Sequence, residues 1–315
     1  MWTRNAIAAT LAIGLLLAAS PATSQEFTVI GTSLQKRVNG ALAMMQYSVS
    51  PDVTTSSLSI SSQQGDSNGM FMTQLGGGFT WSTSLPLYLE GNAGFSRYDP
   101  VFILSDGAET RPVPVQWNSI VGTVGVGWDV PIAKELALRP IANFTLGRVT
   151  SDLRIASRVI EDETGGDIEF VRHGQLNAVG YGGSLMLDYE HHRETHEIDV
   201  EVRLTDVYLQ NFGGTSEAVQ GSAWAQSLGV WSRWRAPTGL RSLDRPVRYV
   251  LEYAFTHYFG PDGDMLGFNN LNSIGAGLEL DTRALERWAT RWRLIGRYRF
   301  GQDVKGWGIG LGISF

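Results

Sequence analysis

Strict alternation of apolar and polar residues is the dominant pattern of this chain. The stretch HEIDVEVRL places Ile198, Val200, Val202 and Leu204 on one face and charged side chains on the other. Successive side chains of a β-strand point to opposite faces, so this period of two predicts a strand between two different environments. The last ten residues, GWGIGLGISF, alternate bulky apolar side chains with Gly and Ser in the same way.

Alternating segments of this kind recur from residue 52 to the end of the chain. The connections after even-numbered segments are mostly short, and those after odd-numbered segments are mostly longer and more polar, although the 236–246 link breaks this rule. The pattern predicts an antiparallel, up-and-down arrangement of about twelve strands. They are centred on 52–63, 70–83, 86–99, 115–131, 136–154, 174–190, 195–210, 219–236, 246–259, 270–282, 290–301 and 306–315.

Segment length and the place of glycine distinguish a soluble sandwich from a membrane barrel. Strands of a sandwich are usually five or six residues long, whereas strands that cross an outer membrane need about nine to eleven. Many of the 37 glycines recur inside the alternating runs, mostly on the face opposite the apolar side chains. We therefore predict an all-β fold for residues 51–315: a transmembrane antiparallel up-and-down β-barrel with lipid outside and a polar lumen inside.

Aromatic residues near the segment ends fit the belts that barrels place at the bilayer interfaces. An even strand number brings both ends of the barrel to the periplasmic side, with the longer loops outside the cell. The predicted periplasmic belt consists of Trp81, Trp128, Trp234, Trp292 and Phe315. The predicted outer belt consists of Tyr98, Trp117, Trp224 and Trp307.

The first 24 residues have the form of a secretory signal peptide. Arg4 precedes an apolar run over residues 6–19, and Ala22 and Ser24 are small residues suited to a cleavage site before Gln25. The chain has no cysteine, so no disulfide supports the exported protein. It carries 25 basic against 31 acidic side chains and no basic block, which argues against a nucleic-acid partner.

Residues 25–50 form a separate N-terminal segment whose pattern changes from strand to helix. Over 28–46 the apolar residues fall at helical spacing, which predicts an amphipathic helix. One such helix followed by twelve strands resembles the translocator domain of autotransporters. This resemblance implies a helix inside the lumen, carried here by Leu34, Lys36, Arg37 and Val38, but without the passenger that autotransporters carry before it. The alternative is a helix in the periplasm or on the inner leaflet.

The end of the chain resembles the recognition signal of outer-membrane barrels. Leu311, Ile313 and Phe315 alternate up to the last residue. The resemblance implies assembly by the barrel-assembly machinery with periplasmic chaperones, and a place in the outer membrane among its lipids and lipopolysaccharide.

Charged side chains on the face opposite the lipid should line the lumen. One interpretation is an electrostatic constriction that selects solutes or holds Lys36 and Arg37; the other is a lattice of salt bridges that stiffens the barrel. The predicted lumen-lining residues are Glu197, Asp199, Glu201, Arg203, Arg233, Arg248, Glu252, Glu279, Arg291, Arg293, Arg297 and Arg299.

Candidate chemistry is sparse. His191, His192 and His196 would suit a metal only on a helix, and they fall in a predicted turn, so we expect no metal or cofactor. The leading hypothesis is a non-enzymatic barrel that acts as a plugged or narrow pore or as a structural surface protein. The alternatives are an open porin-like diffusion channel, a surface hydrolase using His257 with Asp262 or Asp264, and an adhesin acting through the acidic 158–170 loop.

Overall fold

The computed structural model describes most of the predicted strands and part of the N-terminal segment. Among these residues, no helix has the length and hydropathy needed to cross a bilayer. The described residues are 8–11, 27–28, 42, 45–51, 57–60, 70–98, 101–105, 110–114, 116–151, 175–212, 221–260, 268–282, 290–302 and 304–314.

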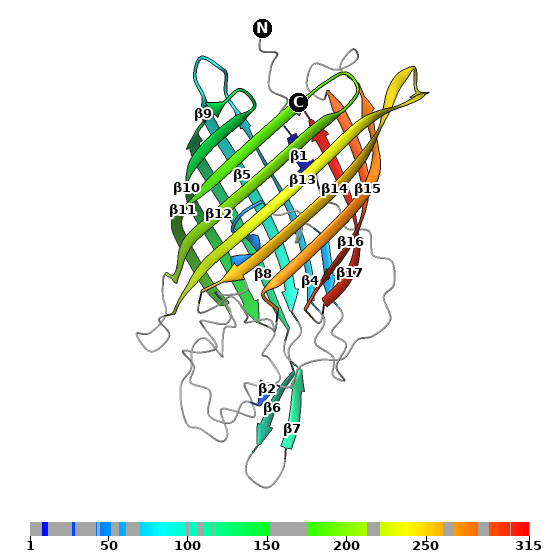
Figure 1. The fold of residues 1–315 in the computed structure, drawn as a ribbon. Helices are drawn as coiled ribbons and strands as arrows, with labels where there is room; N and C mark the ends of the chain where they lie inside the picture. The colour runs from blue at the N-terminus through cyan, green and yellow to red at the C-terminus, as the bar shows by residue number, and fades with distance from the viewer. Residues whose placement is uncertain are drawn as a thin grey trace.

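Twelve consecutive antiparallel strands form the wall of a barrel (Figure 1), which confirms the predicted fold. Each strand pairs with its neighbours in chain order, and the short β9 (Val130–Ala133) pairs with β10 beside them. The wall strands are β3 (Ser57–Ile60), β4 (Met70–Thr80), β5 (Leu87–Tyr98), β8 (Trp117–Trp128), β10 (Leu136–Ser151), β11 (Gln175–His192), β12 (Glu197–Asn211), β13 (Ser222–Ser242), β14 (Arg245–Phe259), β15 (Asn270–Asp281), β16 (Arg291–Gly301) and β17 (Val304–Ser314).

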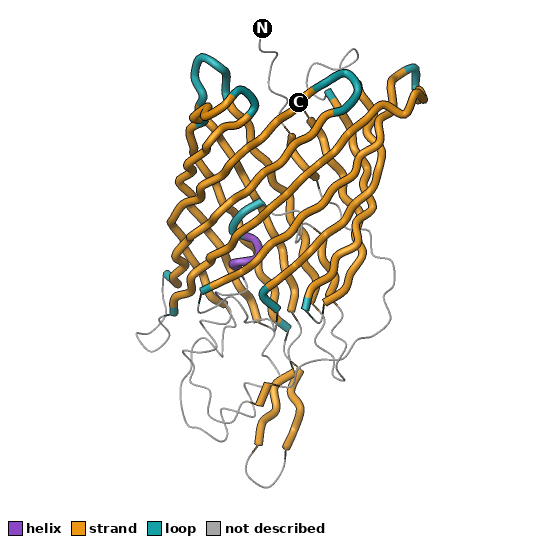
Figure 2. Tube along the Cα trace, in the orientation of Figure 1, coloured by secondary structure: helices purple, strands orange, loops and turns teal. Residues whose placement is uncertain are grey.

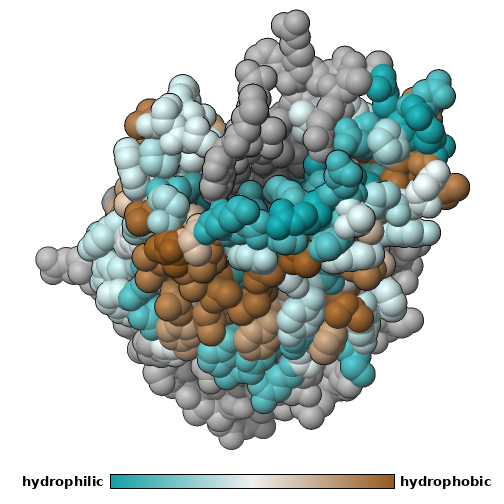
Figure 3. All heavy atoms as spheres, turned by 45° about the horizontal axis from the view of Figure 1, so that its top comes forward, coloured by the Kyte–Doolittle hydropathy of each residue, from teal (hydrophilic) through white to brown (hydrophobic). Residues whose placement is uncertain are grey.

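The two faces of the wall differ as the alternation predicts. On β8, Ile120 is 63% exposed and the next residue, Val121, is 1% exposed. Large apolar side chains such as Val124 and Leu294 are exposed on the outside, and Figure 3 shows apolar residues on the flank of the barrel below a hydrophilic rim. An apolar outer band around a polar interior is the arrangement of an outer-membrane β-barrel.

A short strand from the start of the chain closes the cylinder. β1 (Ala8–Leu11) lies between β17 and β4, with Ala9 opposite Ile313 on one side and Gly77 on the other. β3 covers the other half of β4, from Met70 to Thr73. β1 belongs to the segment that the sequence predicts to be removed as a signal peptide, and that cleavage stays a prediction.

The barrel has a turn end and a loop end, at the top and bottom of Figure 1 respectively. Connections at the turn end are short, as between β11 and β12. Beyond the loop end lies a small sheet in which β2 (Phe27–Thr28) pairs in parallel with β6 (Val101–Ser105), and β6 pairs with β7 (Thr110–Pro114).

The link at 236–246, which broke the predicted rule, is a short turn at the tip of a protruding hairpin. β13 and β14 remain paired down to Ser242 and Arg245, with an irregular register between Pro237 and Arg241. Leu243 and Asp244 both have positive φ, 51° and 59°, as a two-residue hairpin turn requires. The alternation of short and long connections therefore extends to this hairpin.

The predicted aromatic belts are partly confirmed. Trp81, Trp128, Trp234 and Trp292 are exposed at the turn end, and Trp224 and Trp307 at the loop end. The assignment of Tyr98 and Trp117 to the outer belt is wrong. Both point into the barrel, with ring centroids 6.4 Å apart, because Tyr98 lies opposite Trp117 and both have the parity of the inner face. Phe315 lies outside the described residues.

Candidate functional site

A short segment of the chain lies across the lumen (Figure 2). It consists of residue 42 and residues 45–51, and we call it the plug. Leu42 and Met45 are helical, and Gln46–Ser48 form a 3-10 turn. Of the plug residues, Leu42, Met45 and Gln46 belong to the end of the predicted helix over 28–46. The other residues predicted to form the luminal helix lie outside the described part of the chain: Leu34, Lys36, Arg37 and Val38.

Apolar side chains of the plug contact the wall on opposite sides. Leu42, Met45 and Val49 belong to one buried cluster, and Tyr47 belongs to another. The wall contributes Trp117, Val121, Val149, Leu176, Ala178, Val207, Leu209, Ala223 and Ala225 to the first cluster. It contributes Met72, Tyr258, Phe268, Leu271 and Val304 to the second. The plug therefore lies in the loop-end half of the lumen and packs against a ring of inward-facing apolar residues.

Polar groups fix the plug in register with β4 and β5. The side-chain amide of Gln74 donates to the carbonyl oxygen of Tyr47, and that of Asn92 donates to the carbonyl oxygen of Ser48 at 2.7 Å. A Cβ on Gly94 would lie 2.6 Å from the Cβ of Ser48. Gly94 thus makes room for the plug, which explains one of the small residues on the inner face.

The apolar ring was not predicted, although the chain carries a signal for it. Near the loop end the alternation is lost, as in the run VYL at 207–209 and the run AWA at 223–225. Val207 and Ala223 face the lumen while Tyr208 and Trp224 lie on the outer face of the wall. A strand with both faces apolar is buried on both sides. Such a run in a barrel predicts a luminal partner at that depth.

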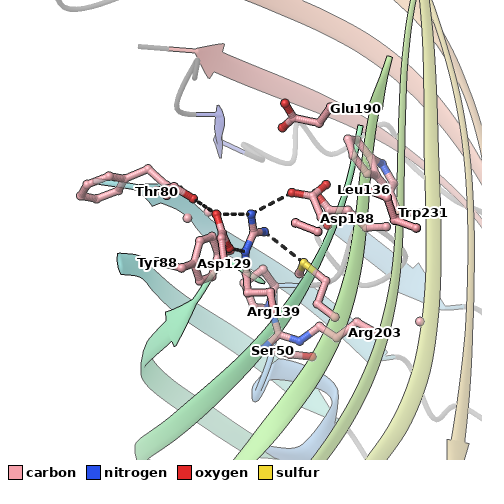
Figure 4. Close-up of a pocket in the computed structure, with 18 of the residues that line it drawn as sticks. Ser50, Thr80, Tyr88, Asp129, Leu136, Arg139, Asp188, Glu190, Arg203 and Trp231 are labelled. Atoms are coloured by element: carbon pink, nitrogen blue, oxygen red, sulfur yellow. Dashed lines mark hydrogen bonds and ion pairs between the residues drawn. The ribbon is translucent and has the colours of Figure 1, made fainter. Parts of the chain in front are cut away.

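A cavity of about 820 Å³ occupies the lumen on the turn-end side of the plug. Ser50 and Pro51 of the plug line its floor, and residues of β4, β5 and β10–β14 line its walls. Figure 4 shows Arg139, Asp188, Glu190 and Trp231 around this space. We call this cavity the vestibule; it lies between the plug and the turn end of the barrel.

A polar network crosses five neighbouring strands, from β4 to β11, at the mouth of this vestibule (Figure 4). Thr80 donates to Asp129, and Arg139 bonds both Asp129 and Asp188, the latter at 2.8 Å. The guanidinium of Arg139 also lies 3.9 Å from the ring centroid of Tyr88. These interactions hold the turn-end rims of β4, β5, β8, β10 and β11 together.

The other side of the lumen is packed with ion pairs rather than open. On the carboxylate of Glu252, Arg297 binds at 2.7 and 3.0 Å and Arg233 at 3.1 Å. Glu197 binds Arg291 at 2.6 Å and also Arg248. Paired charges of this kind are stable inside a barrel because each carboxylate is matched by guanidinium groups.

Glycines of β17 provide the space that these arginines occupy. A Cβ on Gly310 would lie 1.9 Å from Nη1 of Arg297, and one on Gly312 would lie 3.0 Å from Nε of Arg293. The arginines of β16 therefore lie flat over the inner face of β17. The small side chains at the end of the sequence make room for neighbouring side chains rather than for an open channel.

The structure places all twelve predicted luminal charges on the inner face of the wall. Besides those above, Arg203 bonds Glu90 at 2.7 Å through two nitrogens, Asp199 binds Arg235 at 2.6 Å, and Glu279 lies 3.6 Å from Arg293. Glu201 lines the vestibule, and Arg299 is buried. Five further charged residues of the lumen were not predicted: Glu90, Asp129, Arg139, Asp188 and Arg235. Four of the five share the inward parity of their strands, and Asp129 lies at the break between β8 and β9.

The histidines of the predicted turn bind different partners. Nδ1 of His191 lies 2.7 Å from Glu135, and Nε2 of His192 lies 3.1 Å from Asp199. The hydrogen bond with His191 holds the pKa of Glu135, in the turn between β9 and β10, below its usual range. His257, the candidate base of a hydrolase, contacts Asn270 at 2.7 Å, while Asp262 and Asp264 lie outside the described residues.

The residues of the predicted assembly signal lie at the turn end. Leu311 and Ile313 belong to β17, opposite Leu294 and Trp292 of β16, and Phe315 lies outside the described residues. Their role in assembly stays a prediction.

Solved structures similar to this chain include the barrels of three autotransporters. The β domain of the Bordetella autotransporter BrkA has 14% identity and a TM-score of 0.46, with 82% of this chain and 95% of that chain covered. The transport unit of AIDA-I from Escherichia coli has 14% identity and a TM-score of 0.46, with 90% and 98% covered. The translocator domain of NalP from Neisseria meningitidis has 11% identity and a TM-score of 0.40, with 82% and 85% covered.

No protein-family model matches the sequence, and neither does any curated protein. What the barrel does is therefore inferred from its own wall, lumen and plug.

Proposed function

We propose that this chain is an integral outer-membrane β-barrel of autotransporter type, whose pore is closed by its own N-terminal segment. The observation that supports this most strongly is the match between the plug and the apolar ring of the inner wall. A water-filled channel would leave such a ring in contact with water. The plug gives these residues a dry partner.

The contacts of the plug are extensive enough to keep it in place. Leu42, Met45 and Tyr47 are each 0–1% exposed. Burying one such side chain contributes roughly 1.5–3 kcal/mol, so the three together contribute about 5–9 kcal/mol as an upper estimate. Spontaneous departure of the plug should therefore be rare, and the resting conductance should be low.

The wall determines how the barrel sits in the membrane. The loop end is assigned to the cell exterior and the turn end, with the vestibule, to the periplasm, because periplasmic turns are the shorter ones in such barrels. Leu311, Ile313 and Phe315 are the residues through which the barrel-assembly machinery would recognise the chain. We propose no reaction for the barrel and no cofactor.

Single-channel recording in a planar bilayer tests the plug, and the absence of native cysteine makes a reversible lock available. In the mature chain refolded from residue 25, Ser48→Cys with Gly94→Cys would join the plug to β5. We expect the wild type and the oxidised pair to stay closed, with Leu42→Ala/Tyr47→Ala opening to steady conductance. When the Ser48→Cys/Gly94→Cys pair is added to the Leu42→Ala/Tyr47→Ala variant, oxidation should lower the conductance of that variant. The same protein with the cysteines reduced is the matched control.

The porin-like alternative makes the opposite prediction. A wild-type protein that conducts steadily, with the same conductance after deletion of residues 27–47, would exclude the plug and place the barrel among open diffusion channels. A shift in electrophoretic mobility on heating shows that each variant is folded, so that a loss of conductance is not confused with a loss of the barrel. Hydrolysis of lipid or peptide by the wild type that is lost in His257→Ala would instead support the enzymatic alternative.

A further inference from the structure

The vestibule contains two carboxylates that the wall leaves unpaired. Asp129 and Asp188 of the same cavity both bind Arg139, at 3.2 and 2.8 Å. In the part of the chain that the structure describes, the side chains of Glu190 and Glu201 have no hydrogen-bond or ion-pair partner. Both line the cavity, and Glu190 stands above Asp188 on its wall (Figure 4). These two carboxylates are therefore available to whatever enters the vestibule.

The position of Glu201 makes its lack of a partner unfavourable. It lies deep in the lumen, directly opposite Asp188 of β11 on one side and Trp231 of β13 on the other. The guanidinium of Arg233 lies 4.3 Å from the ring centroid of Trp231, but its Nε binds Glu252 at 3.1 Å. Like charges on directly opposite residues are destabilising, and a carboxylate deep in a protein is stable only beside a cation. The fold leaves that cation to a ligand.

The shape of the cavity suits an organic cation better than a metal ion. Its volume of about 820 Å³ is that of a small-molecule site, and Met186, Trp231 and Ala254 provide apolar surface beside the carboxylates. Gly229 adds space, because a Cβ there would meet no atom closer than 4.0 Å. Among the described residues, no group of three His, Asp or Glu side chains is arranged to hold a metal ion. An amine with an apolar chain matches this mixture of surfaces.

The spacing of the two free carboxylates favours two amine groups on one chain. Glu190 lies opposite Asp199, and Glu201 is two residues farther along β12, so the Cα atoms of the two glutamates are about 7–8 Å apart. An extended diamine with a short carbon chain spans a similar distance, and ammonium–carboxylate hydrogen bonds are strong. We propose that the vestibule binds a linear diamine, with one ammonium group on Glu190, the other on Glu201, and the carbon chain against Trp231. This goes beyond closure of the pore, because it assigns a ligand to the space above the plug.

Isothermal titration calorimetry of the refolded mature chain in detergent tests this site, with the five-carbon diamine cadaverine as the probe. We expect the wild type to bind one molecule. The Kd should rise about tenfold in Glu190→Gln or Glu201→Gln and about a hundredfold in the double variant, because each change removes one charge-assisted hydrogen bond. Pentylamine, which has the same chain but one amine, should bind the wild type about tenfold more weakly than cadaverine does. Glu135→Gln is the matched control, because Glu135 lines the same cavity but already binds His191 at 2.7 Å.

Two further measurements separate ligand binding from a structural role of the carboxylates. Glu201→Gln should raise the urea midpoint of the barrel while it weakens cadaverine binding, because it removes a like charge opposite Asp188. A carboxylate that held the wall together would lower the midpoint when it is replaced. Gly229→Leu keeps every charge but extends a side chain into the cavity, so it should weaken cadaverine binding at least about tenfold.

Several outcomes would overturn the proposal. They are no binding of cadaverine at millimolar concentration, an unchanged Kd in the double variant or in Gly229→Leu, and an equal loss of binding in Glu135→Gln. Equal displacement of cadaverine by Mg²⁺ would show a general attraction for cations and would also overturn it. The diamine site and the plug fail separately: if the wild type conducts openly but Glu190 and Glu201 still govern binding, the plug fails and the site stands. If the pore is closed and binding ignores both carboxylates, the reverse holds.

Discussion

Replacing Gly310 by Ala tests whether the glycines of β17 exist to accommodate the arginines of β16. The added Cβ would lie 1.9 Å from Nη1 and 2.6 Å from Cζ of Arg297. Ordinary contacts between such atoms are about 3.5 Å or more, so the guanidinium must move by roughly 1–2 Å. The end of an arginine is flexible in general, but Arg297 is 1% exposed and has no solvent to move into.

The cost follows from what that movement breaks. Arg297 binds Glu252 at 2.7 and 3.0 Å, and a shift of this size lengthens both contacts beyond hydrogen-bond range. Breaking a buried ion pair costs about 3–5 kcal/mol. Arg233 still binds Glu252 at 3.1 Å, so the carboxylate keeps one partner. We therefore expect Gly310→Ala to lower the free energy of unfolding by about 3 kcal/mol, the lower end of that range.

The assay is urea unfolding of the refolded barrel in micelles, followed by tryptophan fluorescence. With a slope of about 3 kcal/mol per molar urea, the midpoint should fall by about 1 M. Gly122→Ala is the matched control, because a Cβ there meets nothing within 4 Å, and its midpoint should hardly change. In an Arg297→Gln background, Gly310→Ala should cost much less. A midpoint for Gly310→Ala equal to that of the wild type would refute the reasoning.

Two further predictions concern the lumen and the closure of the wall. Removing either Glu90 or Arg203 alone should lower the free energy of unfolding by about 3–5 kcal/mol, because each single change leaves a buried charge unpaired. Replacing both residues, by Leu and Met, should lower it clearly less. The same urea midpoints measure both effects. The register of β3 on β4, continued to residues 52–55, reaches Leu75–Gly78, which β1 now pairs with. After removal of residues 1–24 we therefore expect residues 52–55 to pair with β4. In the mature chain, a variant with Val53→Cys and Gly77→Cys should then form a disulfide. Slow or absent formation of this disulfide would contradict the expected pairing.

The wall could be predicted from the sequence because its two faces meet different solvents. A period of two sustained over ten residues determines both strand direction and face, so the luminal orientation of Glu197 or Arg297 followed directly. Arg139 and Asp188 have the same parity as the charges that were predicted, and a stricter count would have found them. The positions of the strand ends were harder, because charged residues near a rim can face either headgroups or the lumen.

The contents of the lumen could not be predicted in the same way. Helical spacing over 28–46 indicates an apolar stripe but not what the stripe packs against, and the register between plug and wall depends on contacts such as Asn92 with Ser48. Tyr98 and Trp117 show the consequence. An aromatic residue near a strand end, considered without its neighbours, fits a membrane belt. The parity of Tyr98 and Trp117 and the apolar plug beside them instead place both side chains inside the barrel.

The small and large residues of the inner wall together explain why the vestibule lies where it does. On the side of β14–β17 the glycines of one strand accept arginines of the next, and these side chains fill the lumen. Toward the loop end, Gly94 and the apolar ring accept the plug. The space left over is on the side of β4 and β10–β13, where Asp188 and Glu201 lie directly opposite each other and no arginine of β16 reaches. Arg139 binds one of these two carboxylates, Asp188, and the like charge of Glu201 opposite it favours solvent over close packing, so this part of the lumen stays open.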